Sequence, residues 1–544
     1  MLLRVIIMQK KFVDKPVKIN NTDPRKFRVW IRGFPFFPLL LTIYAILFFL
    51  DNNIAQVDIH AADRLLLFFS AATLLLLFIM TLVLHDIRRA GLVVFIFGMI
   101  FFTYPHERMV VQENLPALII PMILIPVNIL LMAGAFWVAI KASRDKMATL
   151  SMYLNAITLS LVLIQVTLIL VYEYKITAYW RAARLKVPQH TAEVNPGNSS
   201  FPDVYFIVLD GYARADVLQD ELSLDNSDFL EALRERHFFV ADCSMSNYAQ
   251  TEQSLASTFN MMYIDQIVSG IKDTHLSEDY FSPYIKNNLV RQYFESIGFQ
   301  TVSFFTGYTW AQWPNATYFL GDPRVEGTNA KSLIPFESKF LSRTLFYYME
   351  KNLENLGLVK TPQITGLAGR GVDRAIVLYA LDELPVVVQL RGPKLVYAHI
   401  MLPHPPYVFG PNGEEQDLST DISDVTVLNQ GYRDQVLYAN KRILPIIDTI
   451  LEESRGNVII VLEGDHGIIS ARDAAEHMKN LNAYYFPDHE YSDLYPWITP
   501  VNSFRVILSN YFGQNSPLLK DQSYFSEFSA DKTFSLIPNP CNGK

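Results

Sequence analysis

Hydrophobic residues are distributed in two different ways along the chain. Up to about residue 178 they form long, nearly uninterrupted runs, at roughly 34–50, 65–84, 90–104, 115–140 and 152–172. A membrane span needs about 20 apolar residues, which the second, fourth and fifth runs supply and the first and third approach. Buried helices of a soluble domain would have to produce five such runs in succession. We therefore expect a transmembrane domain of about five helices over residues 1–178.

Lysine and arginine are placed unevenly around these runs. Nine of them precede the first run. The second-to-third and fourth-to-fifth links carry Arg88, Arg89, Lys141, Arg144 and Lys146. The other two links carry only Arg64 and Arg108. Because positive residues favour the cytoplasmic side, we expect a multi-pass protein of the inner or plasma membrane, with a cytoplasmic amino terminus and everything after residue 173 outside.

The pattern changes at a polar segment, 187–202, that contains three prolines and one glycine. Such a composition is typical of a linker, and we assign residues 179–202 to it. Short hydrophobic runs follow, with strands expected at 203–209, 237–241, 300–305, 394–401, 458–462 and 503–508 and amphipathic helices at 228–237 and 430–453. This alternation predicts an α/β domain over 203–515, with a mainly parallel sheet sandwiched by helices, and then a C-terminal tail, 516–544.

Two of the expected buried strands end in acidic turns. The run 458–462 stops at Glu463-Gly464-Asp465-His466-Gly467, and the run 203–209 stops at Asp210-Gly211. Open α/β sheets place ligands at the carboxyl ends of parallel strands, and Asp with His suits a divalent ion such as zinc or manganese. Taken alone, an Asp-His-Gly triplet is more typical of a surface turn.

Thr251 is the candidate for a fourth ligand and for a nucleophile. It lies near the start of a predicted helix, and a metal would lower the pKa of its hydroxyl. An ordinary N-cap is the commoner reason for threonine at a helix start.

Three other histidines lie near these turns in the sequence or end another strand. His404, between two prolines, suits a substrate contact or a second-metal ligand, whereas His399, inside the expected strand 394–401, is typical of a core histidine. His477, in a helical-looking stretch, either reaches back to a substrate oxyanion or is exposed. The two cysteines, Cys243 and Cys541, exclude a disulfide framework and a Cys-rich zinc site; the sequence leaves open whether they pair with each other in an extracytoplasmic domain.

Together, the motifs resemble those of the alkaline phosphatase/sulfatase superfamily. They are Ile207–Gly211, Asn247–Ser254, Pro403–Tyr407 and Glu463–Gly467, in the family's order. With five spans in front, the chain looks most like the membrane-anchored branch that contains lipoteichoic acid synthases and lipid A phosphoethanolamine transferases. The resemblance implies metal ligation by Asp210, Thr251, Asp465 and His466, with Thr251 as nucleophile. It also implies substrate contacts by His404 and His477.

The chain departs from its relatives at three places. The transferases have Glu at the position of Asp210, whereas many hydrolases of the superfamily have Asp there, as this chain does. The transferases also carry several disulfides, which two cysteines cannot match. The segment Cys243–Asn247 lacks the Pro and Arg of the formylglycine motif of sulfatases, so formylglycine chemistry is not expected.

The expected function is therefore a metal-dependent phosphotransferase. It would move a phospholipid head group, phosphoglycerol or phosphoethanolamine, to an extracytoplasmic glycan or lipid through a phospho-threonine. The alternatives are a sulfatase-like hydrolase or phosphodiesterase, with water as acceptor, and a non-catalytic membrane scaffold. The expected partners are a lipid donor and an envelope acceptor but no nucleic acid, and the pattern indicates no particular oligomeric state.

Overall fold

The chain divides into two units, which are described separately. In the computed structural model the described residues are 34–54, 57, 59–112, 120–182, 201–267, 278–323, 325, 335–349, 370–416, 425–526 and 534–541. The first unit is Met1–Phe48 with Asp63–Val166, and the second is Phe49–Ala62 with Thr167–Lys544. Most of the predicted linker and the basic amino-terminal segment lie outside the described residues.

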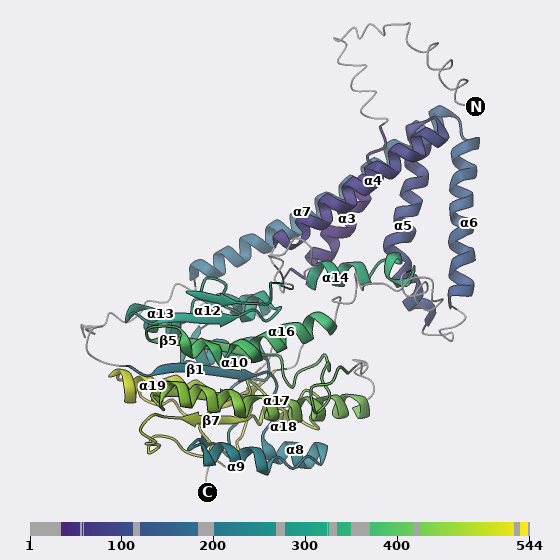
Figure 1. Ribbon diagram of the computed structural model, residues 1–544. Coiled ribbons are helices and arrows are strands. Elements are labelled where there is room, and N and C mark those ends of the chain that lie inside the picture. The colour runs from purple at the N-terminus through teal and green to yellow at the C-terminus, as the bar shows by residue number, and fades with distance from the viewer. Residues whose placement is uncertain are drawn as a thin grey trace. The chain divides into compact units, whose positions relative to one another are not determined.

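Apolar helices make up the first unit (Figure 1). They are α3 (Phe37–Asp51), α4 (Asp63–Leu84), α5 (Ile87–Gln112), α6 (Ile120–Lys141) and α7 (Arg144–Ala182), the last of which continues into the second unit. Among the described residues four helices, α4 to α7, are long and apolar enough to cross a membrane, and α3 is shorter. The third predicted run, expected to be short, is a helix of 26 residues.

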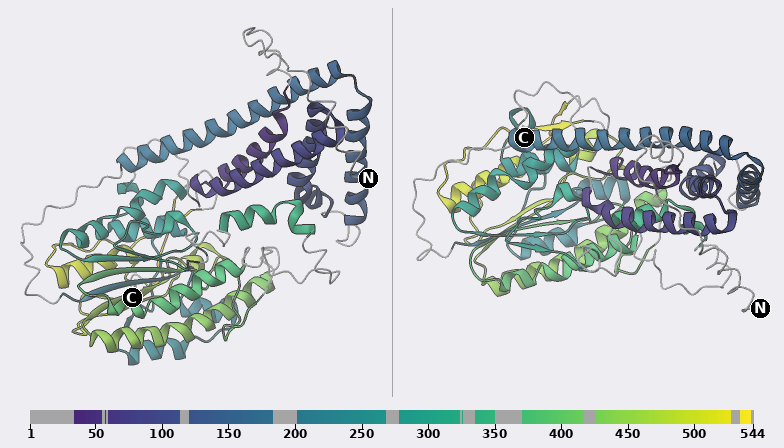
Figure 2. Two further views of the ribbon diagram at one scale, coloured as in Figure 1. Left: turned by 45° about the horizontal axis from the view of Figure 1, so that its top comes forward. Right: turned by 90° about the horizontal axis from the view of Figure 1, so that it is seen from above.

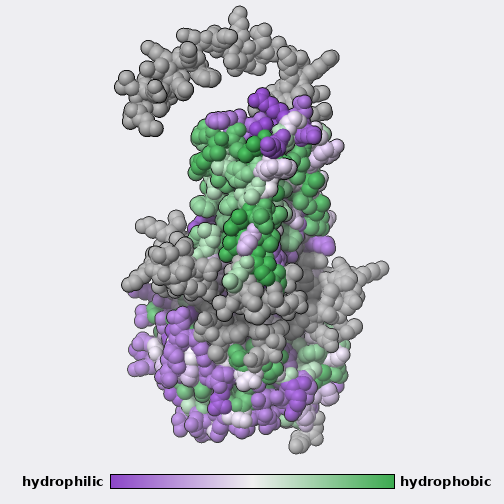
Figure 3. All heavy atoms as spheres, turned by 90° about the vertical axis from the view of Figure 1, so that its right-hand side faces the viewer, coloured by the Kyte–Doolittle hydropathy of each residue, from purple (hydrophilic) through white to green (hydrophobic). Residues whose placement is uncertain are grey.

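The surface of these helices is hydrophobic where Figure 3 shows it in green. Leu67 is 76% exposed, Phe68 66% and Leu130 70%. Large apolar patches of this kind are rare on soluble proteins, and they are favourable when the surrounding solvent is the hydrocarbon of a bilayer. The exposed side chains therefore support the membrane-spanning interpretation of the first unit.

The second unit contains a sheet of seven strands in its described part. They are β1 (Asp203–Leu209), β2 (Phe239–Val240), β3 (Gln300–Phe304), β4 (Tyr318–Leu320), β5 (Lys394–Ile400), β6 (Val458–Glu463) and β7 (Asn482–Tyr485). Their order is β2-β7-β6-β1-β5-β3-β4. The strands from β6 to β4 pair in parallel, whereas β7 is antiparallel to β6 and β2 to β7. The predicted mainly parallel sheet is confirmed.

Helices cover both faces of this sheet (Figures 1 and 2). Alternate residues of β1 enter two separate cores, with Tyr205 and Ile207 in one and Phe206 and Val208 in the other. The first core receives side chains from α8 (Ala215–Leu222), α9 (Ser227–Glu235), α16 (Arg370–Glu383) and α17 (Val425–Ser454). The second receives them from α10 (Thr251–Asn260), α12 (Glu278–Lys286), α13 (Leu289–Ser296) and α19 (Ser503–Phe512). Burial on both faces explains why the strands are continuous hydrophobic runs.

The segment 503–508 is the beginning of helix α19, so the strand predicted there is wrong. Phe504 and Ile507 share one buried side at helical spacing, while the Arg505 guanidinium turns outward and donates to the carbonyl oxygens of Met261 and Pro517. Gly513 ends the helix in a left-handed conformation, with φ of 65°. A segment this short and mostly apolar fits a buried strand and a buried helix equally well, so tertiary packing decides between them.

The described part of the C-terminal tail packs against the rest of the second unit. Its strands β8 (Ser523–Phe525) and β9 (Ser535–Ile537) pair antiparallel. Phe525 and Ile537 pack against Met245, Ala249 and Met478. Cys541 forms a disulfide with Cys243, which ties the tail to the segment that precedes Thr251.

Candidate metal centre

The turns after β1 and β6 lie at the same edge of the sheet. The register pairs Ile207 with Leu462, so Asp210 and Asp465 leave neighbouring parallel strands at one level. The backbone N–H of Gly211 donates to Asp465 Oδ1 at 2.9 Å and joins the two turns. This confirms that the two predicted acidic turns converge.

Glycines make the close approach of these turns possible. A Cβ on Gly464 would lie 2.3 Å from the carbonyl oxygen of Tyr212, and one on Gly467 would lie 2.5 Å from that of Lys479. Gly211 has a φ of +70°, in the left-handed region that favours glycine. The alternation of acids and glycines in the sequence therefore has a steric cause.

His466 faces both carboxylates and the predicted nucleophile. Its Nε2 lies 3.8 Å from Asp210 Oδ1, 3.7 Å from Asp465 Oδ2 and 3.3 Å from Thr251 Oγ1. Its Nδ1 lies 2.8 Å from the carbonyl oxygen of Gly467. Because a carbonyl oxygen can accept a hydrogen bond but cannot donate one, Nδ1 carries a proton, and in the neutral ring the lone pair of Nε2 points into the space shared by His466, Asp210, Asp465 and Thr251.

This space is lined by buried atoms that have no hydrogen-bond partner in the described structure. They are Asp210 Oδ1 and Asp465 Oδ2, on side chains that are at most 3% exposed. An unpaired buried carboxylate oxygen is costly, and a divalent cation removes that cost by coordination. Two carboxylates, one imidazole and one hydroxyl are a donor set that fits a zinc- or manganese-type ion.

Three histidines around Asp210 affect the protonation of its carboxyl group. Burial raises the pKa of its carboxyl, but His404, His399 and His466 together outweigh burial and hold this pKa below its usual range. For His466, burial lowers the pKa, and Asp465 and Asp210 outweigh that effect and raise it. Asp210 is therefore an anion, as metal ligation requires.

Thr251 is the first residue of α10, and the cap position belongs to Gln250, whose backbone is extended. The N-cap interpretation of Thr251 therefore does not apply. The hydroxyl lies at the amino end of the helix, where the helix dipole favours an anion. Ser254 Oγ donates to the carbonyl oxygen of Asp465 at 2.7 Å and holds α10 against the turn that carries Asp465 and His466.

His404 and His477 both lie beside His466, in different ways. The rings of His404 and His466 are 6.5 Å apart, and His404 is partly exposed. The His477 ring stacks on His466 at 5.1 Å, and its nitrogens lie 2.9 and 2.8 Å from the carbonyl oxygens of Ile468 and Ala249. Burial and His466 lower the pKa of His477 to about 4. The substrate role of both histidines stays a prediction.

Comparison with solved structures finds proteins of the kinds that the motifs resemble. The zinc complex of the C-terminal periplasmic domain of EcEptC from Escherichia coli is 13% identical, covers 66% of this chain and 99% of that one, and has a TM-score of 0.39. A second match is the integral membrane protein lipooligosaccharide phosphoethanolamine transferase A (EptA) from Neisseria meningitidis. It is 13% identical, the match covers 88% of this chain and 96% of that chain, and the TM-score is 0.35. A putative sulfatase from Bacteroides thetaiotaomicron is 9% identical; the match covers 60% of this chain and 78% of that chain, and the TM-score is 0.35. No protein-family model and no curated protein matches the chain.

His399 is part of the centre, although its position inside a hydrophobic strand favoured a core role. Its Nε2 lies 2.9 Å from Asp210 Oδ2. One ligand atom each of His399, Asp210 and Asp465 fall within 4.8 Å of one another, and all three residues are buried. The sequence does not reveal that β5 pairs with β1, and this pairing places His399 opposite Val208, close to Asp210.

Proposed function

We propose that the protein is a metal-dependent, membrane-anchored phosphotransferase that moves a phospholipid head group to an extracytoplasmic acceptor through a phosphorylated Thr251. The observation that carries the proposal is the position of the Thr251 hydroxyl. It lies at the amino end of a helix and 3.3 Å from His466 Nε2, and the same nitrogen lies 3.8 and 3.7 Å from the two unpartnered carboxylate oxygens. A plain helix start needs none of these neighbours.

The residues that would hold the ion are Asp210, Asp465, His466 and Thr251, with His399 against the remaining oxygen of Asp210. A divalent ion bound there supplies Lewis-acid chemistry, lowering the pKa of a bound hydroxyl and neutralising phosphate charge. The two carboxylates set the charge of the pocket, and the Gly467 carbonyl holds the His466 ring in the orientation that directs Nε2 inward.

The transfer has two steps on Thr251. In the first, the Thr251 oxygen attacks the phosphorus of the lipid head group, a new O–P bond forms, and the bond to the diacylglycerol oxygen breaks. Thr251 loses its hydroxyl proton and the leaving oxygen takes one up, so protons balance. In the second step an acceptor hydroxyl attacks the same phosphorus and gives up its proton, the O–P bond to Thr251 breaks, and the Thr251 oxygen takes up a proton, so that the hydroxyl is restored. The amino end of α10 stabilises the negative charge that develops on the phosphoryl group in both steps.

Two further observations support the proposed compartment. Within the described part of the chain four helices are long and apolar enough to span a membrane, and a disulfide such as that between Cys243 and Cys541 is typical of an oxidising environment. Together with the Lys and Arg residues in the links between the apolar runs, they favour a cytoplasmic amino terminus. The second unit would then lie on the outer side of the cytoplasmic membrane, next to the lipid donor in that membrane.

The test is the intact mass of the full chain in lipid vesicles with zinc or manganese, compared with Thr251→Ala. We expect a phosphoglycerol or phosphoethanolamine adduct on the wild type and none on the variant, whose loss of one hydroxyl and one methyl group leaves the buried core unchanged. Thr251→Ser is the matched variant, because it keeps the oxygen.

The outcomes separate the three candidate functions. An adduct that moves on to an added glycan or lipid acceptor supports the transferase. Cleavage of a chromogenic phosphodiester or sulfate ester with product released only to water would replace it by a hydrolase. Absence of adduct, stoichiometric metal and cleavage would leave the non-catalytic scaffold.

A further inference from the structure

The helix α14 (Pro335–Ser342) meets the end of an apolar helix within the second unit. Phe336 and Phe340 are each 3% exposed, and their rings lie 5.0 and 5.4 Å from the ring of Phe49, close to the end of α3. The Arg343 guanidinium lies 5.5 Å from the centroid of the same ring. Aromatic side chains therefore fix α14 at the point where the first hydrophobic run of the sequence ends.

A second contact of α14 leads to the same boundary. The helix packs against the short helix η1 (Ile59–Ala62), which also belongs to the second unit. η1 forms the first residues of the candidate span Ile59–Leu84. Because the ends of a spanning helix lie where hydrocarbon meets water, a segment packed against those first residues lies at that boundary. The level of α14 relative to the membrane thus follows from contacts inside one unit.

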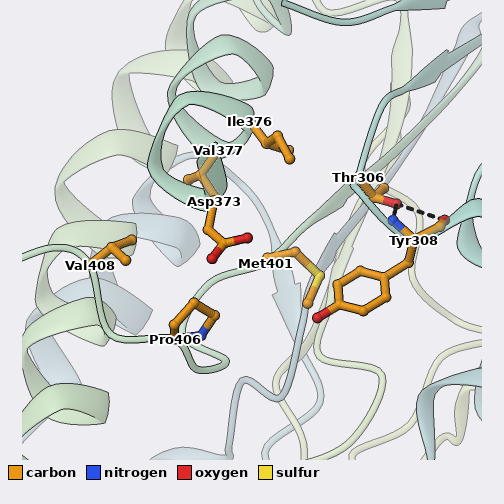
Figure 4. Close-up of a pocket in the computed structure, with 8 residues that line it drawn as sticks. All are labelled: Thr306, Tyr308, Asp373, Ile376, Val377, Met401, Pro406 and Val408. Atoms are coloured by element: carbon orange, nitrogen blue, oxygen red, sulfur yellow. Dashed lines mark hydrogen bonds between the residues drawn. The ribbon is translucent and has the colours of Figure 1, made fainter. Parts of the chain in front are cut away.

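Charged side chains tie α14 to the sheet-containing part of the same unit. Burial and Arg343 lower the pKa of Lys339, on α14, whereas Asp373 raises it, so the three charged groups are neighbours. Asp373 belongs to α16, and Figure 4 shows its carboxylate beside Met401 and Pro406, which follow β5. α14 therefore has neighbours both in the sheet-containing part and at the start of the candidate span.

A shorter helical segment, 345–349, follows α14 after a fixed turn. Thr344 is buried, and its hydroxyl and its N–H both donate to the carbonyl oxygen of Leu341, at 2.8 and 3.1 Å. Phe346 is 37% exposed and Met349 is 54% exposed. At a spacing of three residues these two side chains share one face of the segment. An exposed apolar face therefore lies a few residues from the membrane boundary.

The composition of this segment matches the interfacial region of a bilayer. Single exposed apolar side chains are common on soluble proteins. Here, however, Phe346 and Met349 flank Tyr347 and Tyr348, and the exposed Arg343 precedes them. Aromatic residues are enriched where hydrocarbon meets water, and long basic side chains there extend toward the lipid head groups. The composition and the contact with a candidate span together favour lipid over a protein partner.

We propose that the face formed by Phe346 and Met349 lies in the interface of the membrane, with both side chains among lipid acyl chains just below the head groups. Amphipathic elements of this kind insert their apolar face roughly 5–10 Å into the boundary between head groups and acyl chains. The segment 335–349 thereby gives the second unit an attachment to the membrane surface in addition to its covalent link to the spanning helices. This inference goes beyond the proposed function and does not depend on the reaction at Thr251.

The test uses nitroxide spin labels on the full chain in vesicles of phosphatidylcholine and phosphatidylglycerol. The only two cysteines of the sequence, Cys243 and Cys541, form a disulfide, so an introduced cysteine is the one thiol that takes the label. Phe346→Cys and Met349→Cys are labelled separately, and the collision rates of each label are measured with oxygen, which concentrates in lipid, and with a water-soluble nickel complex. We expect oxygen collisions to dominate at both positions, at a depth of roughly 5–10 Å.

Two further labelled positions calibrate the measurement. Leu75→Cys lies within the candidate span of α4, where Leu75 is 60% exposed, and oxygen should dominate there at a greater depth. Val386→Cys lies on η3 (Val386–Gln389), which follows the carboxyl end of α16, and Val386 is 46% exposed. This position is as apolar and as exposed as the proposed face but does not adjoin α14, so nickel collisions should dominate there.

Two results would overturn the proposal. Nickel collisions at Phe346 and Met349 as frequent as at Val386 would place both side chains in water. Low collision rates with both reagents would show that a protein partner or a second copy of the chain covers the face. Failure of the proposed function is distinguishable from either result, because a chain without any Thr251 adduct that still shows the oxygen preference would leave this membrane surface standing.

Discussion

The turn at Gly467 offers a direct test of how the metal centre is held. The substitution Gly467→Ala places a methyl group 2.5 Å from the carbonyl oxygen of Lys479 and 2.8 Å from that of His477. Both obstacles are backbone atoms, so no side-chain rotation relieves them. Ordinary contact begins at 3.4 Å, and the turn must therefore shift by about 0.9 Å relative to Lys479.

That shift reaches His466, the proposed metal ligand, through one hydrogen bond. His466 Nδ1 donates to the carbonyl oxygen of Gly467 itself, so movement of the turn re-aims Nε2. Sites of this kind tolerate about 0.5 Å of displacement, and loss of the partner that orients a metal-ligating histidine costs about 10- to 100-fold in metal affinity. We expect a loss in this range for Gly467→Ala, with secondary structure preserved.

The assay is a titration of the metal-stripped full chain with zinc or manganese against a chromophoric chelator. Gly134→Ala is the matched control, because a Cβ there meets nothing within 4 Å, and it should bind like the wild type. A Gly467→Ala protein that is folded and binds the metal within twofold of the wild type would refute the link between this turn and His466.

Three further predictions concern charges and the disulfide. His399→Leu removes a group that lowers the pKa of Asp210, so protons compete better for that carboxylate; metal binding should weaken most at acidic pH, and an unchanged pH profile of affinity would contradict this. Burial raises the pKa of Asp216, but Arg214 and Lys479 outweigh it and hold this pKa at about 2. The ion pairs of Asp216 with Arg214 and Lys479 therefore stabilise the fold fully above a pH of about 4, the ordinary pKa of an aspartate. This contribution is lost as the pH falls toward 2, the pKa of Asp216 in the folded protein. Asp216→Asn should lose roughly 1 kcal/mol or less at neutral pH, since Asp216 is partly exposed; a melting temperature that falls with acid as steeply as in the wild type would argue against it. The double variant Cys243→Ser, Cys541→Ser should be less stable by about 2–5 kcal/mol, and an unchanged unfolding midpoint would show that the tail contributes nothing.

The fold class could be predicted because both kinds of hydrophobic run have a simple physical cause. Runs of about 20 apolar residues match the bilayer, and short β-branched runs such as 458–462 match strands that are covered on both faces. The run 503–508 shows where this reasoning ends, because its burial pattern suits either a strand or a helix and only its packing as α19 decides.

The candidate site divides along the same line. The sequence by itself determined that Asp210, Asp465 and His466 end hydrophobic strands in tight glycine turns and that Thr251 opens a helix, since such local patterns depend on neighbouring residues alone. Only the tertiary structure decided that His399 joins them and that His477 turns its nitrogens to main-chain carbonyls. The physical reason is that these placements follow from which strands pair and which helices pack, and those contacts join residues that are far apart in the sequence.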